Sequence, residues 1–70
     1  MSIEHLSKSK LEFLIDEYIV GRNASRNKEI LRYRLIDGMT YENIAEKVDM
    51  SDRQIKNIVY KYEQKLLKYI

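Results

Sequence analysis

Apolar residues recur along this 70-residue chain at intervals of three and four, which places their side chains on one face of an α-helix. Three points interrupt the pattern: Gly21, Gly38 and the segment 49–51. Glycine just past a periodic segment commonly ends a helix, because it adopts the left-handed conformation without a steric penalty. We therefore predict four helices, over about residues 3–20, 25–37, 41–48 and 52–69.

The helix predicted over 52–69 has the clearest two-sided pattern. Its apolar face consists of Ile55, Ile58, Val59, Tyr62, Leu66, Tyr69 and Ile70. The opposite face consists of Arg53, Asn57, Tyr60, Lys61, Gln64 and Lys68. Ser51 is a suitable N-cap, and Gln54 three residues later completes a capping box. The pattern predicts an amphipathic helix whose polar face is basic.

The segments 41–48 and 52–69 meet the steric requirements of a helix-turn-helix, in which two helices cross steeply through a tight turn. Ala45 is the small residue needed where the backbones approach, and Asp49 tolerates the positive φ that the turn needs. Apolar residues at the remaining positions hold the crossing angle: Ile44, Val48, Met50, Ile55 and Ile58. We predict a single all-α domain with the helix-turn-helix at about residues 40–62. A generic helical hairpin is the alternative.

Composition narrows the possible chemistry. The chain has no cysteine, which excludes disulfides and thiolate metal sites, and its one histidine, His5, is too few for a His-rich zinc site. No Gly-rich phosphate loop is present, and no serine or threonine has a histidine placed to activate it. We therefore expect no enzyme, no cofactor and no metal. Without a long apolar segment or a secretory signal, a cytoplasmic location is expected.

Charge is unevenly distributed although the net charge is only +2. Residues 51–70 carry five basic and two acidic side chains, whereas residues 1–50 carry eight and nine. A second basic group, opposed only by Glu29, consists of Arg22, Arg26, Lys28, Arg32 and Arg34. Such runs are commonly solvated helix faces, and they also attract nucleic-acid phosphates.

Residues 29–66, EILRYRLIDGMTYENIAEKVDMSDRQIKNIVYKYEQKL, resemble region four of bacterial sigma factors and the related activators of phage late genes. The most specific parts of the match are Gly38–Thr40–Tyr41, Ile44–Ala45 and 51–55. The chain departs from the family at Asp49, where glycine is usual, and it lacks the upstream domains of a full sigma factor. The resemblance implies promoter or operator binding, with RNA polymerase as a possible neighbour.

The resemblance also implies which residues contact DNA. The family's groove-facing positions fall on Asp52, Arg53, Lys56, Asn57 and Tyr60. Thr40, Tyr41 and Ser51 lie at helix N-termini, where hydroxyls and N–H groups commonly hold phosphates. Lys61 and Lys68 would add sequence-independent attraction. Two alternatives stay open: Tyr60 as an exposed aromatic without a role, and Asp52 as a helix-start charge.

These patterns predict a sequence-specific DNA-binding transcriptional regulator of phage or mobile-element type. The main alternative is a helix-turn-helix that binds a protein, such as RNA polymerase or a host defence factor. A membrane-surface helix is disfavoured because the 52–69 helix has no Trp or Phe anchor.

The first predicted helix suggests a homodimer. Leu11, Leu14, Ile15 and Tyr18 form one apolar stripe. Leu6, Phe13 and Val20 recur at a spacing of seven on nearly the opposite face, which predicts a dimer interface. In the competing interpretation, the C-terminal helix covers this back face through Leu67 and Ile70.

Overall fold

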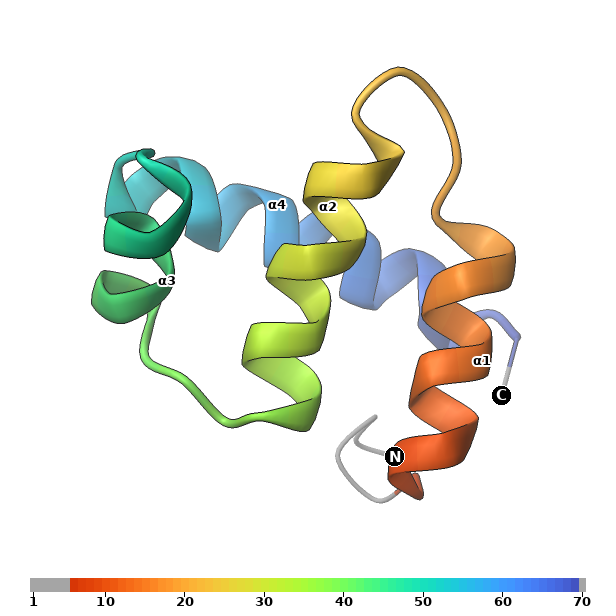
Figure 1. Cartoon of the computed structure of the whole chain (residues 1–70). Helices are drawn as coiled ribbons and strands as arrows, with labels where there is room; N and C mark the ends of the chain where they lie inside the picture. Colours follow the sequence, from red (N-terminus) through yellow and green to blue (C-terminus); the bar gives the residue numbers. More distant parts are fainter. Residues whose placement is uncertain (1–5, 70) are drawn as a thin grey trace.

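The computed structural model describes residues 6–69, which form helices and no strand (Figure 1). The helices are α1 (Lys8–Tyr18), α2 (Ala24–Leu31), α3 (Tyr41–Val48) and α4 (Asp52–Leu67), and α2 continues directly into a π-helical segment, η2 (Arg32–Ile36). In Figure 1, α1 and α3 lie toward opposite ends of α4, and α2 with η2 runs between them. The predicted all-α class and the order of four helices are confirmed.

Helix α1 is shorter than predicted at both ends. Ser7 is its N-cap: the Ser7 backbone is extended, and its hydroxyl oxygen accepts a hydrogen bond from the Lys10 N–H at 3.2 Å. The helix ends at Tyr18, because Ile19 turns to an extended conformation and is fully buried. Prediction of a helix over 3–20 was therefore wrong at residues 6, 7, 19 and 20, and residues 3–5 lie outside the described part.

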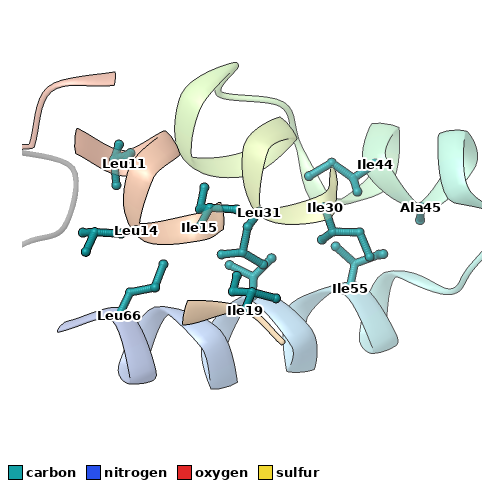
Figure 2. Packing of buried hydrophobic residues seen from close by; sticks show 11 residues of the cluster. Leu11, Leu14, Ile15, Ile19, Ile30, Leu31, Ile44, Ala45, Ile55 and Leu66 are labelled. Carbon is teal, nitrogen blue, oxygen red and sulfur yellow. The ribbon is translucent and has the colours of Figure 1, made fainter. Parts of the chain in front are cut away.

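Buried aliphatic side chains from α1, α2, α3 and α4 form one core (Figure 2). Its members are Leu11, Leu14, Ile15, Ile19, Ile30, Leu31, Ile44, Ala45, Ile55, Val59 and Leu66. The predicted inner stripe of α1 is confirmed, since Leu11, Leu14 and Ile15 are buried and Tyr18 packs against them. Burial of this kind contributes about 1.5–3 kcal/mol for each large aliphatic side chain, so the core is the main source of stability.

The second predicted helix, over 25–37, is α-helical only as far as Leu31. In η2 the Asp37 N–H bonds to the Arg32 carbonyl five residues earlier, at 3.0 Å. Gly38, with φ of 69°, then reverses the chain, and the Met39 N–H bonds to the Tyr33 carbonyl at 2.9 Å. The predicted glycine stop is confirmed, whereas the wide turn before it was not predicted.

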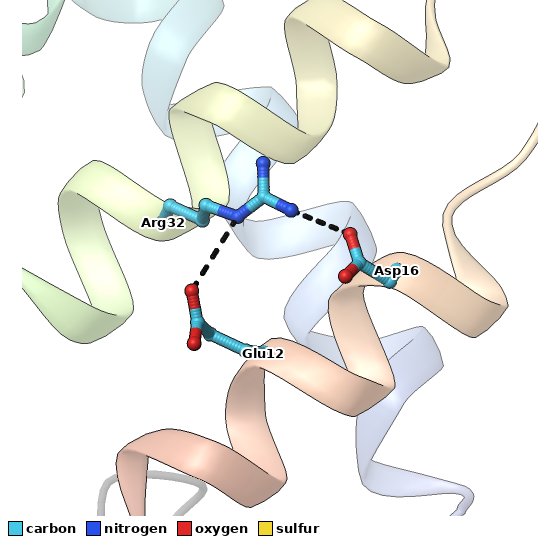
Figure 3. Close-up of polar contacts among 3 residues, drawn as sticks. All are labelled: Glu12, Asp16 and Arg32. Carbon is cyan, nitrogen blue, oxygen red and sulfur yellow. Dashed lines mark hydrogen bonds and ion pairs between the residues drawn. The ribbon is translucent and has the colours of Figure 1, made fainter.

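An ion pair ties α1 to η2 (Figure 3). The Arg32 guanidinium donates to the Asp16 carboxylate and lies 4.0 Å from the Glu12 carboxylate, one turn earlier on α1. All three side chains are partly exposed. Such surface pairs are typically worth about 0–1 kcal/mol, so this one adds little to the stability of the fold.

Helix α4 ends at Leu67, two residues before the predicted end. Tyr69 follows in a turn, and its ring stacks on that of Tyr18 with 3.7 Å between centroids. The C-terminal part of α4 therefore packs on the inner stripe of α1, to which Tyr18 belongs. The back face that the competing interpretation expected it to cover stays exposed at Phe13 and Val20. The buried contact is made by Leu66, while Leu67 is half-buried and Ile70 lies outside the described residues. Within residues 6–69, no helix is both long and apolar enough to span a bilayer.

Candidate nucleic-acid interface

Helix α3 packs against α4, and Ala45 is one of its two buried residues. The Ala45 methyl group is only 5% exposed, and Ile44 and Ile55 beside it in the core are fully buried. Val48, Met50 and Ile58 pack against the same core from the two helices and the turn. The small side chain predicted at this crossing and the apolar residues around it are therefore found where the sequence placed them.

Asp49 makes the turn between the two helices. Its φ of 56° and ψ of 52° place it in the left-handed region, and it is the sole non-glycine residue with positive φ in the part described. The N–H groups of Asp49 and Met50 both donate to the Ala45 carbonyl, which closes the end of α3. The predicted positive φ of Asp49 is confirmed, so the departure from glycine leaves the turn intact.

Both helices of the turn begin with a side-chain cap. The Ser51 hydroxyl oxygen accepts from the Gln54 N–H at 3.2 Å, and the Gln54 amide oxygen accepts from the Ser51 N–H at 3.0 Å. This is the predicted capping box. Thr40 caps α3, its hydroxyl oxygen accepting from the Asn43 N–H at 3.1 Å. Since the Ser51 hydroxyl also donates to Gln54, Thr40 is the better placed of the two to donate to a phosphate.

The residues of α4 that were predicted to face DNA are all exposed. These are Asp52, Arg53, Lys56, Asn57, Tyr60 and Lys61, and Lys68, which follows the end of the helix, is exposed as well. Tyr60 is 69% exposed, which leaves its ring without a packing role in the core. The structure thus separates α4 into an inner apolar face and an outer polar face, as the sequence pattern predicted.

A shallow groove of about 330 Å³ lies between the starts of α3 and α4. It is lined by Arg34, Thr40, Tyr41, Glu42, Asp52 and Lys56. The Tyr41 ring lies between η2 and α4. The Arg34 guanidinium of η2 is 4.3 Å from its centroid, and the Lys56 ammonium of α4 is 5.8 Å from it. Two cations and two carboxylates balance in this groove, so it is not by itself an anion site. Tyr41 is half-buried between these two cations.

Arg34 was predicted as part of a basic group, without a link to the helix-turn-helix. In the structure it donates to the Met39 carbonyl at 3.0 Å and covers Tyr41. The wide turn of η2 precedes this contact, and no periodicity in the sequence signals it.

The basic group of residues 22–34 is not one surface. Arg34 faces α3, Arg32 pairs with carboxylates of α1, and Arg22 and Arg26 stay exposed near the start of α2. The acidic member of the region, Glu29, accepts a hydrogen bond from the Tyr33 hydroxyl at 2.6 Å. That hydrogen bond, with smaller contributions from burial and from the charges of Glu29 and Asp37, raises the pKa of Tyr33 above its ordinary 10.0.

The three residues predicted to form a dimer interface do not make a helical stripe. Leu6 precedes the N-cap of α1 and packs partly against the core, and Val20 lies beyond the end of the helix. Phe13 and Val20 are exposed, at 52% and 61%. The interval of seven residues would have placed Leu6, Phe13 and Val20 on one face only if the helix had extended from residue 6 to residue 20. Helix α1 is shorter than that.

Among residues 6–69, no group of three His, Asp or Glu side chains is placed to hold a metal ion. Comparison of the chain with protein-family models, with curated proteins and with solved structures gives no match.

Proposed function

We propose that this chain is a sequence-specific DNA-binding regulator of transcription, with α4 as the recognition helix of a helix-turn-helix. The observation that carries the proposal is the exposed row of Arg53, Lys56 and Asn57 at the start of α4. Arginine and lysine donate to guanine, and asparagine pairs with both a donor and an acceptor of adenine. The proposed function involves no reaction and no cofactor.

The dimensions of α4 support this assignment. Residues 52–60 rise about 12 Å along the helix axis at about 1.5 Å per residue, which is close to the major-groove width of about 12 Å. The capping box and the Asp49 turn hold the start of α4 against α3, so its outer side chains project from a fixed base. Thr40 and Tyr41, at the start of α3, would approach the phosphates on one side of the groove.

The resemblance of residues 29–66 to sigma region four supports a more specific form of the proposal. In that form the chain binds a promoter or operator, beside RNA polymerase, as a regulator of phage or mobile-element type.

The test is selection of bound sequences from a random pool of DNA duplexes with the purified chain. On the selected site, Arg53→Ala or Asn57→Ala should cost about 1–3 kcal/mol of binding free energy and relax one base position. Lys68→Ala is the matched control, because it should weaken all sequences alike. Circular dichroism should stay unchanged in each variant. If alanine at Arg53, Lys56 and Asn57 together leaves the affinity intact, α4 does not occupy the groove.

The alternative function is binding of a protein, such as RNA polymerase or a host defence factor. One observation favours it, the exposed ring of Tyr60, because aromatic residues are enriched in protein interfaces. The charged residues around Tyr60 favour DNA instead, since charge is depleted at the centre of such interfaces. A chain that selects no DNA sequence but loses binding to polymerase on Tyr60→Ala would establish the alternative.

We also propose a homodimer as the DNA-binding form, since one recognition helix reads only a short sequence. A two-fold pair would read two half-sites about 34–36 Å apart. The exposed side chains of Phe13 and Val20 are the remaining support for an interface near α1.

A further inference from the structure

A hydrogen-bonded bridge joins the start of α2 to the middle of α4. The Asn27 amide N–H donates to the Tyr62 hydroxyl at 3.1 Å, and the Asn27 amide oxygen accepts from the Arg26 guanidinium at 3.2 and 3.4 Å. Asn27 is the one buried polar side chain of the core region described, at 5% exposure. The bridge therefore holds the exposed Arg26 guanidinium at the contact between the two helices.

Lys61 approaches the same tyrosine from α4. Its ammonium lies 5.5 Å from the centroid of the Tyr62 ring, within the range of a cation–π contact. Arg26 and Lys61 are both exposed, and each contacts one member of the bridge, Arg26 through Asn27 and Lys61 through Tyr62. In the described part of the chain the ion pairs all use Arg32, so neither cation has a carboxylate partner there. Exposed cations without a counter-charge, fixed to the two sides of one bridge, are available to bind an external anion.

This pair extends the outer face of α4. Arg53, Asn57, Lys61 and Lys65 follow one another at intervals of four, which makes them neighbours along one side of the helix. From Arg53 to Lys65 the row rises about 18 Å at about 1.5 Å per residue. A major groove is only about 12 Å wide. If α4 crosses the groove with its start against the bases, the end of the row extends past the edge of the groove toward the flanking phosphates.

We propose that Arg26 and Lys61 form a second DNA contact, on the phosphate backbone that flanks the groove occupied by the start of α4. The inference rests on the proposed DNA-binding function and adds a partner surface from α2, outside the helix-turn-helix. The contact is independent of sequence and lies on one side of each bound half-site. The Asn27–Tyr62 bridge fixes its position relative to the groove-facing residues.

The test is the salt dependence of duplex binding by the full chain. Each lost phosphate contact lowers the slope of log K against log salt by about 0.9. The double variant Arg26→Gln and Lys61→Gln should therefore have a slope smaller in magnitude by about 1.8. A fourfold rise in salt should then reduce its DNA affinity by a factor about twelve times smaller than for the wild type. The control variant, Lys8→Gln and Lys10→Gln on α1, removes the same charge and should keep nearly the wild-type slope. Arg26→Lys with Lys61→Arg should also keep it, because both charges remain.

A second measurement uses wild-type protein, so it does not depend on the folding of a variant. Uncharged methylphosphonate linkages are placed beside each half-site, first on one flank of the half-site and then on the other. Binding should weaken with the linkages on one of these two flanks only, and the double variant should be insensitive to the change there. If the wild type binds its site but neither the double variant nor either flank alters the slope, the second contact is overturned and the proposed function stands. A wild type that binds no duplex, or binds only an acidic protein through this surface, overturns both.

Discussion

Replacement of Ala45 by leucine tests the geometry on which the DNA-binding proposal depends. The Ala45 side chain is 5% exposed and belongs to the buried cluster that contains Ile44 and Ile55 (Figure 2). Leucine adds three carbon atoms between α3 and α4, where the backbones approach each other. Overpacking of a well-filled core typically costs about 1–3 kcal/mol, so Ala45→Leu should lower the free energy of unfolding by that amount.

The loss should be visible as a change in melting temperature. For a domain of this size, each kcal/mol shifts the midpoint by about 4–8 °C. The assay is thermal and urea unfolding followed by circular dichroism. Glu46→Leu is the matched control, because it introduces the same side chain at the next position of α3, where the residue is exposed. That variant should melt close to the wild type.

The same variant should also weaken DNA binding, since a changed crossing angle moves the outer face of α4 relative to Thr40 and Tyr41. Equal melting temperatures for Ala45→Leu and Glu46→Leu would refute the reasoning. They would mean that α3 and α4 are not in close contact at Ala45 and that the turn does not set their angle.

Three further predictions concern the turn, a titrating tyrosine and the oligomeric state. Asp49→Gly should keep or raise the urea midpoint, whereas Asp49→Val should cost about 1–2 kcal/mol because a branched Cβ is strained at positive φ; equal midpoints for the two variants would contradict this. Because the pKa of Tyr33 is raised on folding, its contribution to stability is complete below pH 10.0 and is lost as pH rises through the folded-state pKa. Urea unfolding across this range should therefore show a smaller alkaline loss for Tyr33→Phe than for the wild type, and identical pH profiles would show that the Glu29 bond is absent in solution. Sedimentation should show a dimeric wild type and a folded, monomeric Phe13→Asp; a monomeric wild type removes the dimer from the proposed function.

The parts of the fold that sequence predicted well are those set by local steric and hydrogen-bonding rules. Ser51 and Gln54 form a capping box because their spacing alone allows the reciprocal bonds. The turn requires a residue with positive φ, and aspartate is one of the few non-glycine residue types that adopt it at modest cost, so Asp49 could be assigned to this position. The exposed face of α4 could be predicted from the helical period of its polar residues, because that period is a local property and does not depend on tertiary contacts. For these reasons the arrangement of the candidate site was predictable.

The parts that were missed depend on contacts between distant segments. The helix over 3–20 was predicted from apolar spacing, but Ile19 leaves the helix and packs fully into the core. The π-helical turn η2 follows α2, which contacts both α1 and α4. It precedes the loop before α3, where Arg34 donates to the Met39 carbonyl. Propensity does not distinguish that turn from an α-helix. The bridge from Asn27 to Tyr62 spans 35 positions, and neither residue belongs to a pattern that would pair them.

Most of the buried core that packs against α3 and α4 comes from residues outside the segment 40–62. Of the eleven buried apolar residues described, only Ile44, Ala45, Ile55 and Val59 fall within residues 40–62. The rest come from α1, α2, the residue after α1 and the end of α4. Two polar contacts join the supporting helices to the site: Arg34 holds the loop before α3 and covers Tyr41, and Asn27 holds Tyr62 of α4. Because small domains bury little surface, removal of these supports should loosen the face that we propose meets DNA. The same helices that complete the core therefore fix the direction in which Arg53 and Asn57 project.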